Sequence, residues 1–393
     1  MTRRVGIEVS AAVAEAVRLV DVDVISAYPI TPQTHIVEKL AELIANGELD
    51  AEYMNVESEH SALSACVGAS AAGARTFTAS NSQGLALMHE ILYVASGCRL
   101  PIVLAIVNRA LSAPINIWCD HQDSLGERDT GCIQVYVEDG QEAFDSTLQA
   151  FRVAEDQRVL VPFMVCLDGF ILSHVIESVN LLDEKEIKGF IKSKRESKYR
   201  LDPDEPISMG VLGGPDVYSE FRRQQEETMR NAKKVILEVD EEFGKLYGRR
   251  YGLFDSYRVE DADVILLTMG SMTGTARVAV DKLREKGKKV GILKVRVFRP
   301  FPYKEICDAV RGAKVLATVD RNVEPGAFGG ILFTEVRSAL YRYEEEPHVV
   351  GFITGLGGRD VTLINFMTMA EKALRVAETG KVERAYEFIG LRE

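Results

Sequence analysis

Polar side chains follow several apolar stretches of this 393-residue sequence. Thr31 stands between Pro29 and Pro32, directly after the apolar run that ends at Tyr28. In open parallel sheets, ligands bind beyond the carboxyl ends of the strands, where the Thr31 hydroxyl could hydrogen-bond one. The same residues are also typical of a helix start, with threonine at the N-cap and proline at the first helical position. From these residues alone, the helix cap is the preferred interpretation.

Two carboxylates, Glu57 and Glu59, stand where the next apolar run gives way to a helix. The helix dipole favours carboxylates in a first turn, so they could simply stabilise the helix. The helix is expected to begin near Ser58 and to cover Ser61–Gly73, and it consists mostly of alanine, serine and glycine. Such a surface lets a backbone, a subunit or a cofactor ring approach closely. Tight packing of the helix on a sheet explains the composition equally well, and both interpretations stay open.

A long polar loop, Asn108–Gly131, follows the apolar run that ends at Val107. It contains the only tryptophan, Trp118, and these charged or titratable residues: Arg109, Asp120, His121, Asp123, Glu127, Arg128 and Asp129. A long charged loop at a strand end is more often functional than decorative. The sequence DHQD within it could suggest a metal site, but charge pairs within the loop explain these residues as well. No metal site is therefore predicted.

Strand and helix patterns alternate along the chain, which predicts an α/β fold with parallel sheets to position these residues. The first half is expected to contain strands at Val22–Tyr28, Ala51–Val56, Thr76–Ala79, Ile102–Val107, Ile133–Val137 and Val159–Leu167. Helices are expected between them, at Ala11–Val20, Gln33–Ala45, Ser61–Gly73, Gly84–Ser96 and Gln141–Ala154.

The chain then loses this pattern and regains it. Residues 182–206 are rich in lysine and glutamate and read as a solvated connection, followed by a long charged helix over 220–247. A second α/β unit is expected from Asp263, with strands at 263–271, 290–298 and 314–320, and helices at Gly274–Lys286, Lys304–Val310 and Ile331–Tyr341. We therefore predict two α/β domains, residues 1–205 and 259–393, joined by a charged linker and helix over 206–258.

The composition and the missing motifs argue against several classes of function. The formal net charge of −12 argues against nucleic acid or an anionic membrane as the main partner. The six cysteines are scattered, with no C-x-x-C spacing, which argues against an iron–sulfur cluster or a zinc site held by this chain alone. G-x-G-x-x-G, P-loop and G-x-S-x-G motifs are missing. The sequence shows no signal peptide and no apolar span of membrane length, so a cytoplasmic location is expected.

Six motifs in register resemble a known family. They are AYPITPQT, VESEHSALSACVGASAAGARTFTASNSQGLALMHE, PIVLAIVNRALSAPINIWCDHQD, ERDTG, FRPFP and GLGGRD. Together they resemble the α subunit of the multi-subunit pyruvate:ferredoxin oxidoreductases, within the 2-oxoacid:ferredoxin oxidoreductase family. The resemblance runs in order from the N-terminus to the closing FIGLRE. Each motif alone is weak, and their common order gives the resemblance its strength.

The resemblance implies an enzyme that cleaves a 2-oxoacid with thiamine diphosphate, passes electrons to ferredoxin and transfers the acyl group to coenzyme A. Pyruvate would give acetyl-CoA and CO₂, or be made in the reverse reaction. The first domain would be the pyrimidine-type thiamine diphosphate domain, and the second would resemble the C-terminal domain of transketolase. A β subunit would bind the diphosphate and its Mg²⁺, while 4Fe-4S clusters would lie in partner subunits, with γ and δ ferredoxin-like. The missing G-D-G…N diphosphate motif agrees with this division.

The resemblance also assigns roles to individual residues. Glu59 would hydrogen-bond the pyrimidine ring nitrogen and drive the proton relay of the cofactor. Thr31 would lie beside the substrate. Arg109 would hold the substrate carboxylate, a task that suits the planar, charged fork of an arginine guanidinium. Pro29, Ile30 and Ser82 would contact the cofactor. The two prolines would then fix the Thr31 hydroxyl at a rigid strand end, so the cap and ligand roles are compatible.

Two alternatives remain. A sister enzyme could act on oxalate, 2-oxoglutarate, or a branched-chain or aromatic 2-oxoacid; Thr31 speaks against oxalate, because the similar oxalate enzymes carry arginine there. A non-catalytic α/β binding module could keep the fold without the chemistry. The joint presence of Thr31, Glu59 and Arg109 favours the enzyme.

Overall fold

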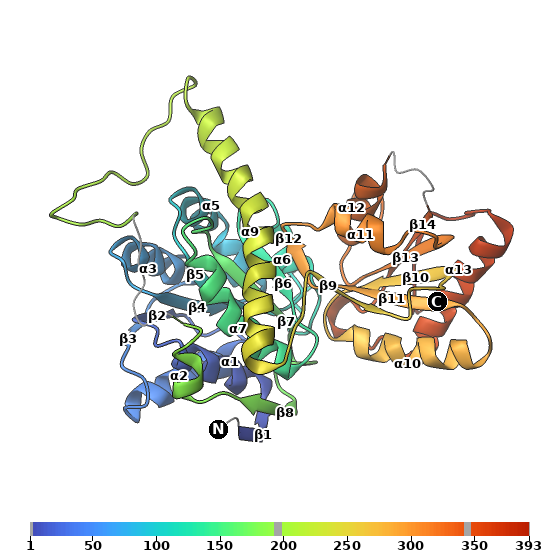
Figure 1. Cartoon of the computed structure of the whole chain (residues 1–393), viewed down its shortest axis with the longest axis horizontal. Coiled ribbons are helices and arrows are strands. Elements are labelled where there is room, and N and C mark those ends of the chain that lie inside the picture. Colours follow the sequence, from blue (N-terminus) through green and yellow to red (C-terminus); the bar gives the residue numbers. More distant parts are fainter. Residues whose placement is uncertain (1–2, 192–198, 342–346, 393) are drawn as a thin grey trace.

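The chain folds into two α/β units connected by a long helix, shown in a computed structural model that describes residues 3–191, 199–341 and 347–392 (Figure 1). The predicted α/β class is confirmed. The strands of the larger sheet are β2 (Val24–Ala27), β3 (Glu52–Asn55), β4 (Thr76–Ser80), β5 (Ile102–Asn108), β6 (Ile133–Tyr136), β7 (Phe163–Asp168) and β12 (Val297–Arg299). Their order is β12-β6-β7-β5-β4-β2-β3, and every neighbouring pair is parallel except β12 with β6.

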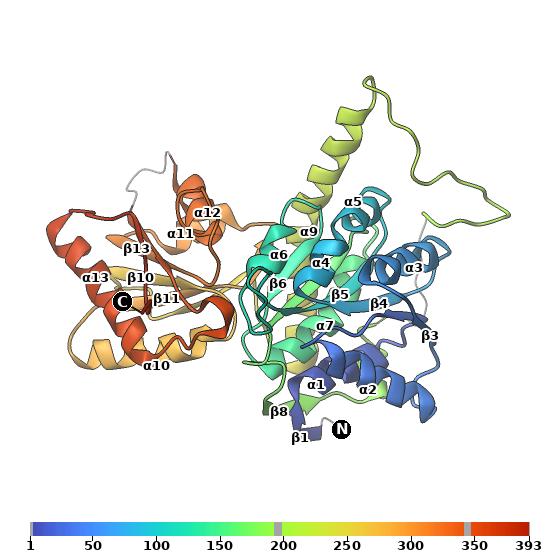
Figure 2. The ribbon, with the colours of Figure 1, turned by 180° about the vertical axis from the view of Figure 1, so that it is seen from behind.

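Helices cover both faces of this sheet, which explains why β5 and β7 are continuous apolar runs. One face carries α1 (Val9–Leu19), α2 (Thr34–Ala45) and α7 (Gly140–Ala154), and the other carries α3 (Glu59–Ala71), α4 (Ser82–Leu87) and α5 (His89–Gly97) (Figure 2). Side chains alternate along β5, so Val103 and Ala105 enter the first core while Ile102 and Leu104 enter the second. The predicted helix over 84–96 is present, with a break of one residue between α4 and α5.

Two antiparallel strands that the sequence did not predict, β1 (Arg3–Glu8) and β8 (Ile176–Leu181), form a small separate sheet.

The segment after β8 corrects part of the predicted solvated connection over 182–206. Part of the predicted solvated connection, 192–198, lies outside the described residues. Within the described part, Phe190 is 2% exposed and its ring lies 5.2 Å from that of Phe243. Apolar side chains among the lysines and glutamates therefore bury part of residues 182–191, where the solvated interpretation is wrong, whereas residues 199–206 are almost all exposed, as that interpretation expects.

The predicted long helix is confirmed as α9 (Tyr218–Tyr247). Its second half packs on α7 through a buried stripe with helical spacing, made of Thr228, Ala232, Val235, Ile236, Val239 and Phe243. Its first turns stand away from the body of the molecule, and so does most of the loop 199–217 before it (Figure 1). The loop contacts the body where the Leu201 N–H donates to the Ala71 carbonyl at 2.7 Å and where Met209 packs on the core. This projecting loop carries several exposed apolar side chains: Tyr199, Leu201, Ile207, Val211, Leu212 and Val217.

The second unit contains a six-stranded sheet with the order β15-β14-β13-β10-β11-β9. Its strands are β9 (Phe254–Tyr257), β10 (Val264–Thr268), β11 (Val290–Val295), β13 (Val315–Asp320), β14 (His348–Ile353) and β15 (Tyr386–Phe388). Helices α10 (Met272–Glu285) and α13 (Leu363–Thr379) cover one face, and α11 (Tyr303–Ala309) and α12 (Ile331–Leu340) cover the other. The sheet is parallel except for β9.

The two units share a strand segment, which corrects the single strand predicted over 290–298. The segment divides at Arg296, so that β11 stays in the second sheet and β12 joins the edge of the first. The division has an electrostatic cause. The buried Arg296 donates from Nε to Glu142 at 3.0 Å, and Lys294 donates to the same carboxylate at 2.8 Å. Both cations are thereby fixed to the start of α7.

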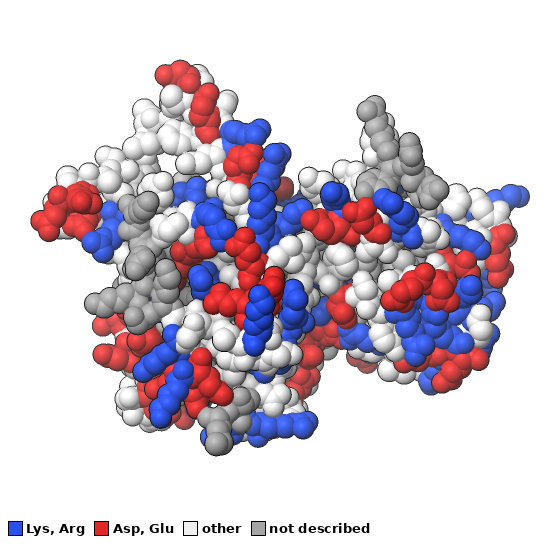
Figure 3. All heavy atoms as spheres, in the orientation of Figure 1, with Lys and Arg blue, Asp and Glu red and all other residues white. Residues whose placement is uncertain are grey.

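Charged side chains of both signs are mixed over both units on the face drawn in Figure 3. Among the described residues, no helix combines the length and the apolar character that a membrane crossing requires.

Candidate active site

The strand order brings the predicted site residues to one edge of the larger sheet. Strands β5, β4, β2 and β3 are parallel neighbours, so their carboxyl ends meet at the same edge. Thr31 follows β2, Glu59 follows β3, Ser82 follows β4 and Arg109 follows β5. This edge is where parallel sheets bind ligands. Residues up to 78 positions apart in the sequence therefore lie next to each other at this edge.

Arg109 and Thr31 are in direct contact. The guanidinium donates from Nη1 to the Thr31 carbonyl at 2.9 Å and from Nε to the Asn116 carbonyl, also at 2.9 Å. Arg109 is 7% exposed, and burial lowers its pKa while the nearby Asp123 carboxylate opposes that shift. An arginine remains charged under such conditions. Its Nη2 group has no hydrogen-bond partner among the described residues, so one edge of the charged fork is available to an anion.

Thr31 is not a helix cap, which corrects the interpretation preferred from the sequence. Helix α2 begins at Thr34 and its N-cap is Gln33. A reverse turn precedes it, in which the Gln33 N–H donates to the Ile30 carbonyl at 2.9 Å. The Gln33 side chain closes this turn by donating to the Tyr28 carbonyl, also at 2.9 Å. The exposed Thr31 hydroxyl makes no hydrogen bond to the described part of the chain and is therefore available to a ligand.

Glu59 is the first residue of α3 and is 7% exposed. Ser58 caps the helix by accepting a hydrogen bond from the Ser61 N–H, so the cap lies where the sequence predicted the helix start. A Cβ atom at Gly84 would overlap the Glu59 carboxylate, so only glycine leaves room for it. Its carboxylate has no hydrogen-bond partner among the described residues. The helix dipole alone compensates a buried carboxylate only in part, so this one suits a ligand that donates a hydrogen bond.

Ser82 lies two residues before Gly84, the glycine that contacts Glu59. Its backbone has an unusual conformation, with φ at +47°. Its hydroxyl donates to the Ala110 carbonyl at 2.6 Å, which ties the end of β4 to the loop after β5. On its two sides, the Asn81 Oδ1 and Gln83 Nε2 atoms are buried without a partner among the described residues. Pro29 is exposed and Ile30 is half-buried, and the Ile30 carbonyl accepts from Asn81 at 3.1 Å.

Asp123 connects these segments, a role that no local sequence pattern indicates. Its buried carboxylate accepts from the Ser82 N–H and the Arg109 N–H, each at 2.9 Å, and from the Asn108 side chain at 2.8 Å. Burial raises the pKa of Asp123, while the donated hydrogen bonds act in the opposite direction. One carboxylate on the short helix α6 (Gln122–Gly126) therefore fixes the ends of β4 and β5 relative to each other.

Two other residues of the polar loop, His121 and Arg128, have partners outside it. His121 Nε2 lies 2.8 Å from Asp168 at the end of β7, and Arg128 pairs with Glu324 at 3.0 Å. The expected charge pairs within the loop are therefore wrong for these residues. Cys119, His121 and Asp168 lie close enough to share a metal ion. Asp168 instead pairs with the buried Arg321 at 2.9 Å, and His121 and Arg321 hold its pKa below the usual range.

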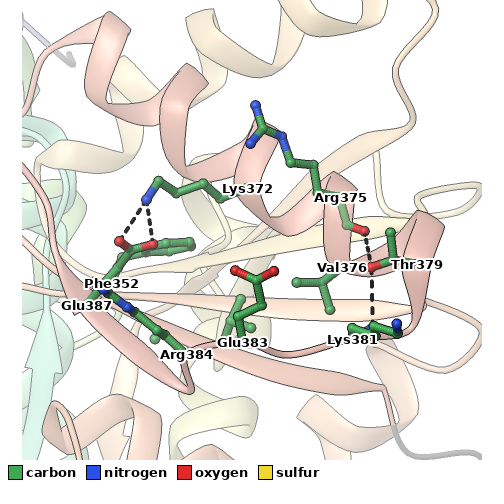
Figure 4. A pocket seen from close by; sticks show the side chains of 11 residues that line it. Phe352, Lys372, Arg375, Val376, Thr379, Lys381, Glu383, Arg384 and Glu387 are labelled. Carbon is green, nitrogen blue, oxygen red and sulfur yellow. Dashed lines mark hydrogen bonds and ion pairs between the residues drawn. The ribbon is translucent and has the colours of Figure 1, made fainter.

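A separate groove of about 480 Å³ lies on the second unit, between α13 and the β14–β15 edge (Figure 4). Lys372 pairs with Glu387 across it at 2.7 Å, and Glu383 and Arg384 add further charges of both signs. None of the predicted site residues lines this groove. It therefore takes no part in the site at the edge of the larger sheet.

The fold and the site are those of an α/β enzyme. The buried Glu59 carboxylate and the Arg109 guanidinium lie together at the carboxyl edge of a parallel sheet. Residues 15–241 match the family described as pyruvate flavodoxin/ferredoxin oxidoreductase, thiamine diphosphate-binding, and residues 262–366 match pyruvate:ferredoxin oxidoreductase core domain II. The chain belongs to the pyruvate:ferredoxin oxidoreductase family, as the resemblance of its motifs predicted.

Curated relatives match over nearly their whole length. The chain is 53% identical to pyruvate synthase subunit PorA of Methanothermobacter thermautotrophicus, with 98% of each chain covered. It is also 53% identical to the Methanocaldococcus jannaschii protein of the same name, covering 92% of this chain and 94% of that one. It is 47% identical to ketoisovalerate oxidoreductase subunit VorA of Pyrococcus abyssi, covering 97% and 96%.

Solved structures share the fold at lower identity. A 2-oxoglutarate:ferredoxin oxidoreductase from Magnetococcus marinus, solved with 2-oxoglutarate, coenzyme A and succinyl-CoA bound, has a TM-score of 0.73 at 20% identity. The match covers 95% of this chain and 65% of that one. A split-gene transketolase, crystallised as an inactive β4 tetramer, has a TM-score of 0.55 at 14% identity, covering 95% and 100%.

Proposed function

We propose that this chain is the α subunit of a thiamine-diphosphate-dependent pyruvate:ferredoxin oxidoreductase. The assembled enzyme converts pyruvate, coenzyme A and oxidised ferredoxin to acetyl-CoA, CO₂ and reduced ferredoxin, or catalyses the reverse reaction. The observation that carries this proposal is the 53% identity to pyruvate synthase subunits over nearly the whole chain. The described site agrees with it, because the site pairs a buried carboxylate with a charged fork at one sheet edge.

The residues at this edge fit the pyrimidine half of thiamine diphosphate. When bound, the cofactor supplies the carbanion chemistry that cleaves the bond beside the carbonyl carbon of a 2-oxoacid. Glu59 would hydrogen-bond a pyrimidine ring nitrogen and exchange a proton with it, and its lack of another partner supports this role. The partnerless Asn81 Oδ1 and Gln83 Nε2 atoms support a polar ligand beside Ser82. Pro29 and Ile30 would border the same ring.

Arg109 and Thr31 would bind the substrate itself. The uncommitted Nη2 edge of Arg109 suits the carboxylate of pyruvate, because charge-assisted hydrogen bonds from a guanidinium are strong and directional. The Thr31 hydroxyl would approach the same molecule, since the Arg109 guanidinium already contacts the Thr31 carbonyl. These two residues hold and orient the 2-oxoacid, and Glu59 acts on the cofactor.

The chain would act only with partner subunits. We assign the diphosphate and its Mg²⁺ to a β subunit, and the 4Fe-4S clusters to β and to ferredoxin-like γ and δ subunits, with ferredoxin as the electron acceptor. The described cysteines support this division, because five of the six are buried as free thiols. The exposed apolar side chains of the projecting loop 199–217 support contact with another subunit. We place the assembly in the cytoplasm.

The proposed domains follow the sequence prediction. The pyrimidine-type domain covers residues 1–205, the linker and long helix cover 206–258, and the transketolase-C-terminal-like domain covers 259–393. The larger sheet takes β12 from the last of these ranges, so the first domain is bound to the last by backbone pairing as well as by side chains.

A second candidate is an enzyme for branched-chain 2-oxoacids, favoured by the 47% identity to a ketoisovalerate oxidoreductase subunit. One experiment separates the two. The complex is purified from its native host, and viologen reduction is measured with coenzyme A across a panel of 2-oxoacids. The highest kcat/KM with pyruvate is expected. Preference for 2-oxoisovalerate would select the second candidate, and no turnover with any 2-oxoacid would contradict both.

A further inference from the structure

A glycine turn of the second unit contacts the loop that holds Arg109. The turn is the GLGG part of the GLGGRD motif, between β14 and α13. Gly355, Gly357 and Gly358 have φ angles of +74°, +58° and +79°, a conformation that residues with a Cβ adopt at a cost. The motif helps to place the chain in its family, but neither the substrate nor the cofactor roles described above involve it.

The turn meets the loop through direct hydrogen bonds. Asn116 donates from Nδ2 to the Gly357 carbonyl at 3.1 Å, and the Gly358 N–H donates to the Cys119 carbonyl at 2.6 Å. Space at the contact is minimal. A Cβ atom at Gly357 would lie 2.5 Å from Asn116 Nδ2, and one at Gly358 would overlap Cβ of Trp118. Glycine is thus needed here for close approach as well as for its φ angle.

Asn116 links this contact to Arg109. Its carbonyl accepts from Arg109 Nε at 2.9 Å, one of the two main-chain contacts that hold the guanidinium. Its side chain donates to the Gly357 carbonyl and accepts from the Trp118 N–H at 2.7 Å. The Ala110 N–H donates to the Trp118 carbonyl at 2.9 Å and closes the loop at its base. A shift of the turn therefore moves the Asn116 carbonyl, and with it the Arg109 fork.

We propose that the glycine turn of the second unit positions the Arg109 guanidinium through Asn116 and thereby sets the affinity for the substrate carboxylate. The proposal rests on the proposed function of Arg109. Asn116 is a positioning residue, since its carbonyl holds the guanidinium and its side chain holds the turn. The second unit thus supports half of the substrate site without touching the substrate.

The test compares matched glycine variants in the purified complex with its partner subunits. Gly357→Ala brings a Cβ against Asn116, whereas Gly380→Ala adds one at a similar φ of +66° with nothing within 4 Å. Asn116→Asp keeps the acceptor for Trp118 and places a carboxylate against the Gly357 carbonyl. We expect Gly357→Ala and Asn116→Asp to raise KM for pyruvate roughly three- to tenfold, the worth of one hydrogen bond, with kcat nearly unchanged. Gly380→Ala should leave KM unchanged.

Two further measurements distinguish positioning from general damage. Thiamine diphosphate affinity should be the same in all variants. In the Arg109→Lys background, which lacks the positioned fork, Gly357→Ala should add little to the rise in KM, since its effect acts through that fork. If Arg109→Lys alone leaves KM unchanged, the proposed role of Arg109 fails and this inference fails with it. If Arg109→Lys raises KM but Gly357→Ala behaves like Gly380→Ala, or adds its full effect to Arg109→Lys, the inference alone is overturned.

Discussion

At the scale of single residues, the substrate pair Thr31 and Arg109 gives the first prediction. Arg109→Lys keeps the charge but loses the fork, and charge-assisted bonds of roughly 1.5–3 kcal/mol correspond to about one to two decades in affinity. We expect a raised KM for pyruvate and little change in thiamine diphosphate affinity.

Thr31→Val should lower kcat/KM for pyruvate without unfolding the turn, because the Gln33 side chain rather than Thr31 closes the turn. Steady-state kinetics on the reconstituted complex and separate cofactor titration check both. Loss of cofactor affinity with an unchanged KM would place these residues in the cofactor pocket instead.

Asp123 gives the second prediction at this scale. Asp123→Asn replaces one carboxylate oxygen with an NH2 group, and each of the two oxygens accepts from two donors. Either the Ser82 and Arg109 N–H groups or the Asn108 side chain and the Ser124 N–H therefore lose the acceptor that they share. An unsatisfied buried donor costs about 1–3 kcal/mol. We expect a lower unfolding midpoint in denaturant together with a raised KM for pyruvate. Asp129→Asn, in the same loop, is the control. A variant with wild-type stability and KM would show that Asp123 does not organise the site.

At the scale of elements, the packing of α4 on α3 gives the third prediction. Gly84→Ala would normally favour a helix, but here the added Cβ would displace the Glu59 carboxylate. We expect at least about a tenfold loss of turnover, on the scale of the 10²–10⁴-fold contribution of an acid–base group. Gly68→Ala in α3 has nothing within 4 Å and should keep full activity. Equal activity in the two variants would show that this contact does not hold Glu59 in place.

The elements also show what the sequence could predict. Strands such as β5 and β7 are predictable, because burial on both faces demands continuous apolar runs. The helix start at Ser58 follows from local capping chemistry. The division of 290–298 depends on ion pairs to Glu142, 152 and 154 residues earlier in the chain, and no local pattern reports such partners.

Some residues of the candidate site could also be predicted from the sequence, and others could not. The family resemblance pointed to Thr31, Glu59 and Arg109, and strand order explains why they meet. Sequence reasoning placed Thr31 at a helix cap, because threonine before proline is a common helix start. It missed the side chain of Gln33, which closes the turn instead. It also treated Asp123 as one charge of a loop, because its partners are main-chain N–H groups that any sequence offers.

At the scale of the whole molecule, one hydrophobic core extends through both units. It joins Leu104 and Met164 of the larger sheet to Leu267 and Leu293 of the smaller one. The buried group of His121, Asp168 and Arg321 crosses the same boundary. The two units are therefore fixed relative to each other, which is the condition for the second unit to support the site of the first.

The whole chain gives the fourth prediction. Purified alone, it should be colourless, free of iron–sulfur clusters and inactive, since its cysteines are scattered and the diphosphate motif is missing. Absorption spectra, iron content and viologen reduction check this. Added partner subunits should restore activity. An iron–sulfur absorption band in the single chain, or turnover without partners, would contradict the division of the active site between subunits.

The proposed chemistry depends above all on Glu59 as the carboxylate that acts on the bound cofactor. The most direct measurement is the turnover number of the reconstituted complex with Glu59→Gln, after its assembly has been verified by size and subunit content. The amide cannot exchange the required proton, so we predict a loss of about 10²–10⁴-fold in kcat in a fully assembled complex. Turnover within a few-fold of the wild type would contradict it and leave Glu59 as a stabiliser of the α3 helix dipole.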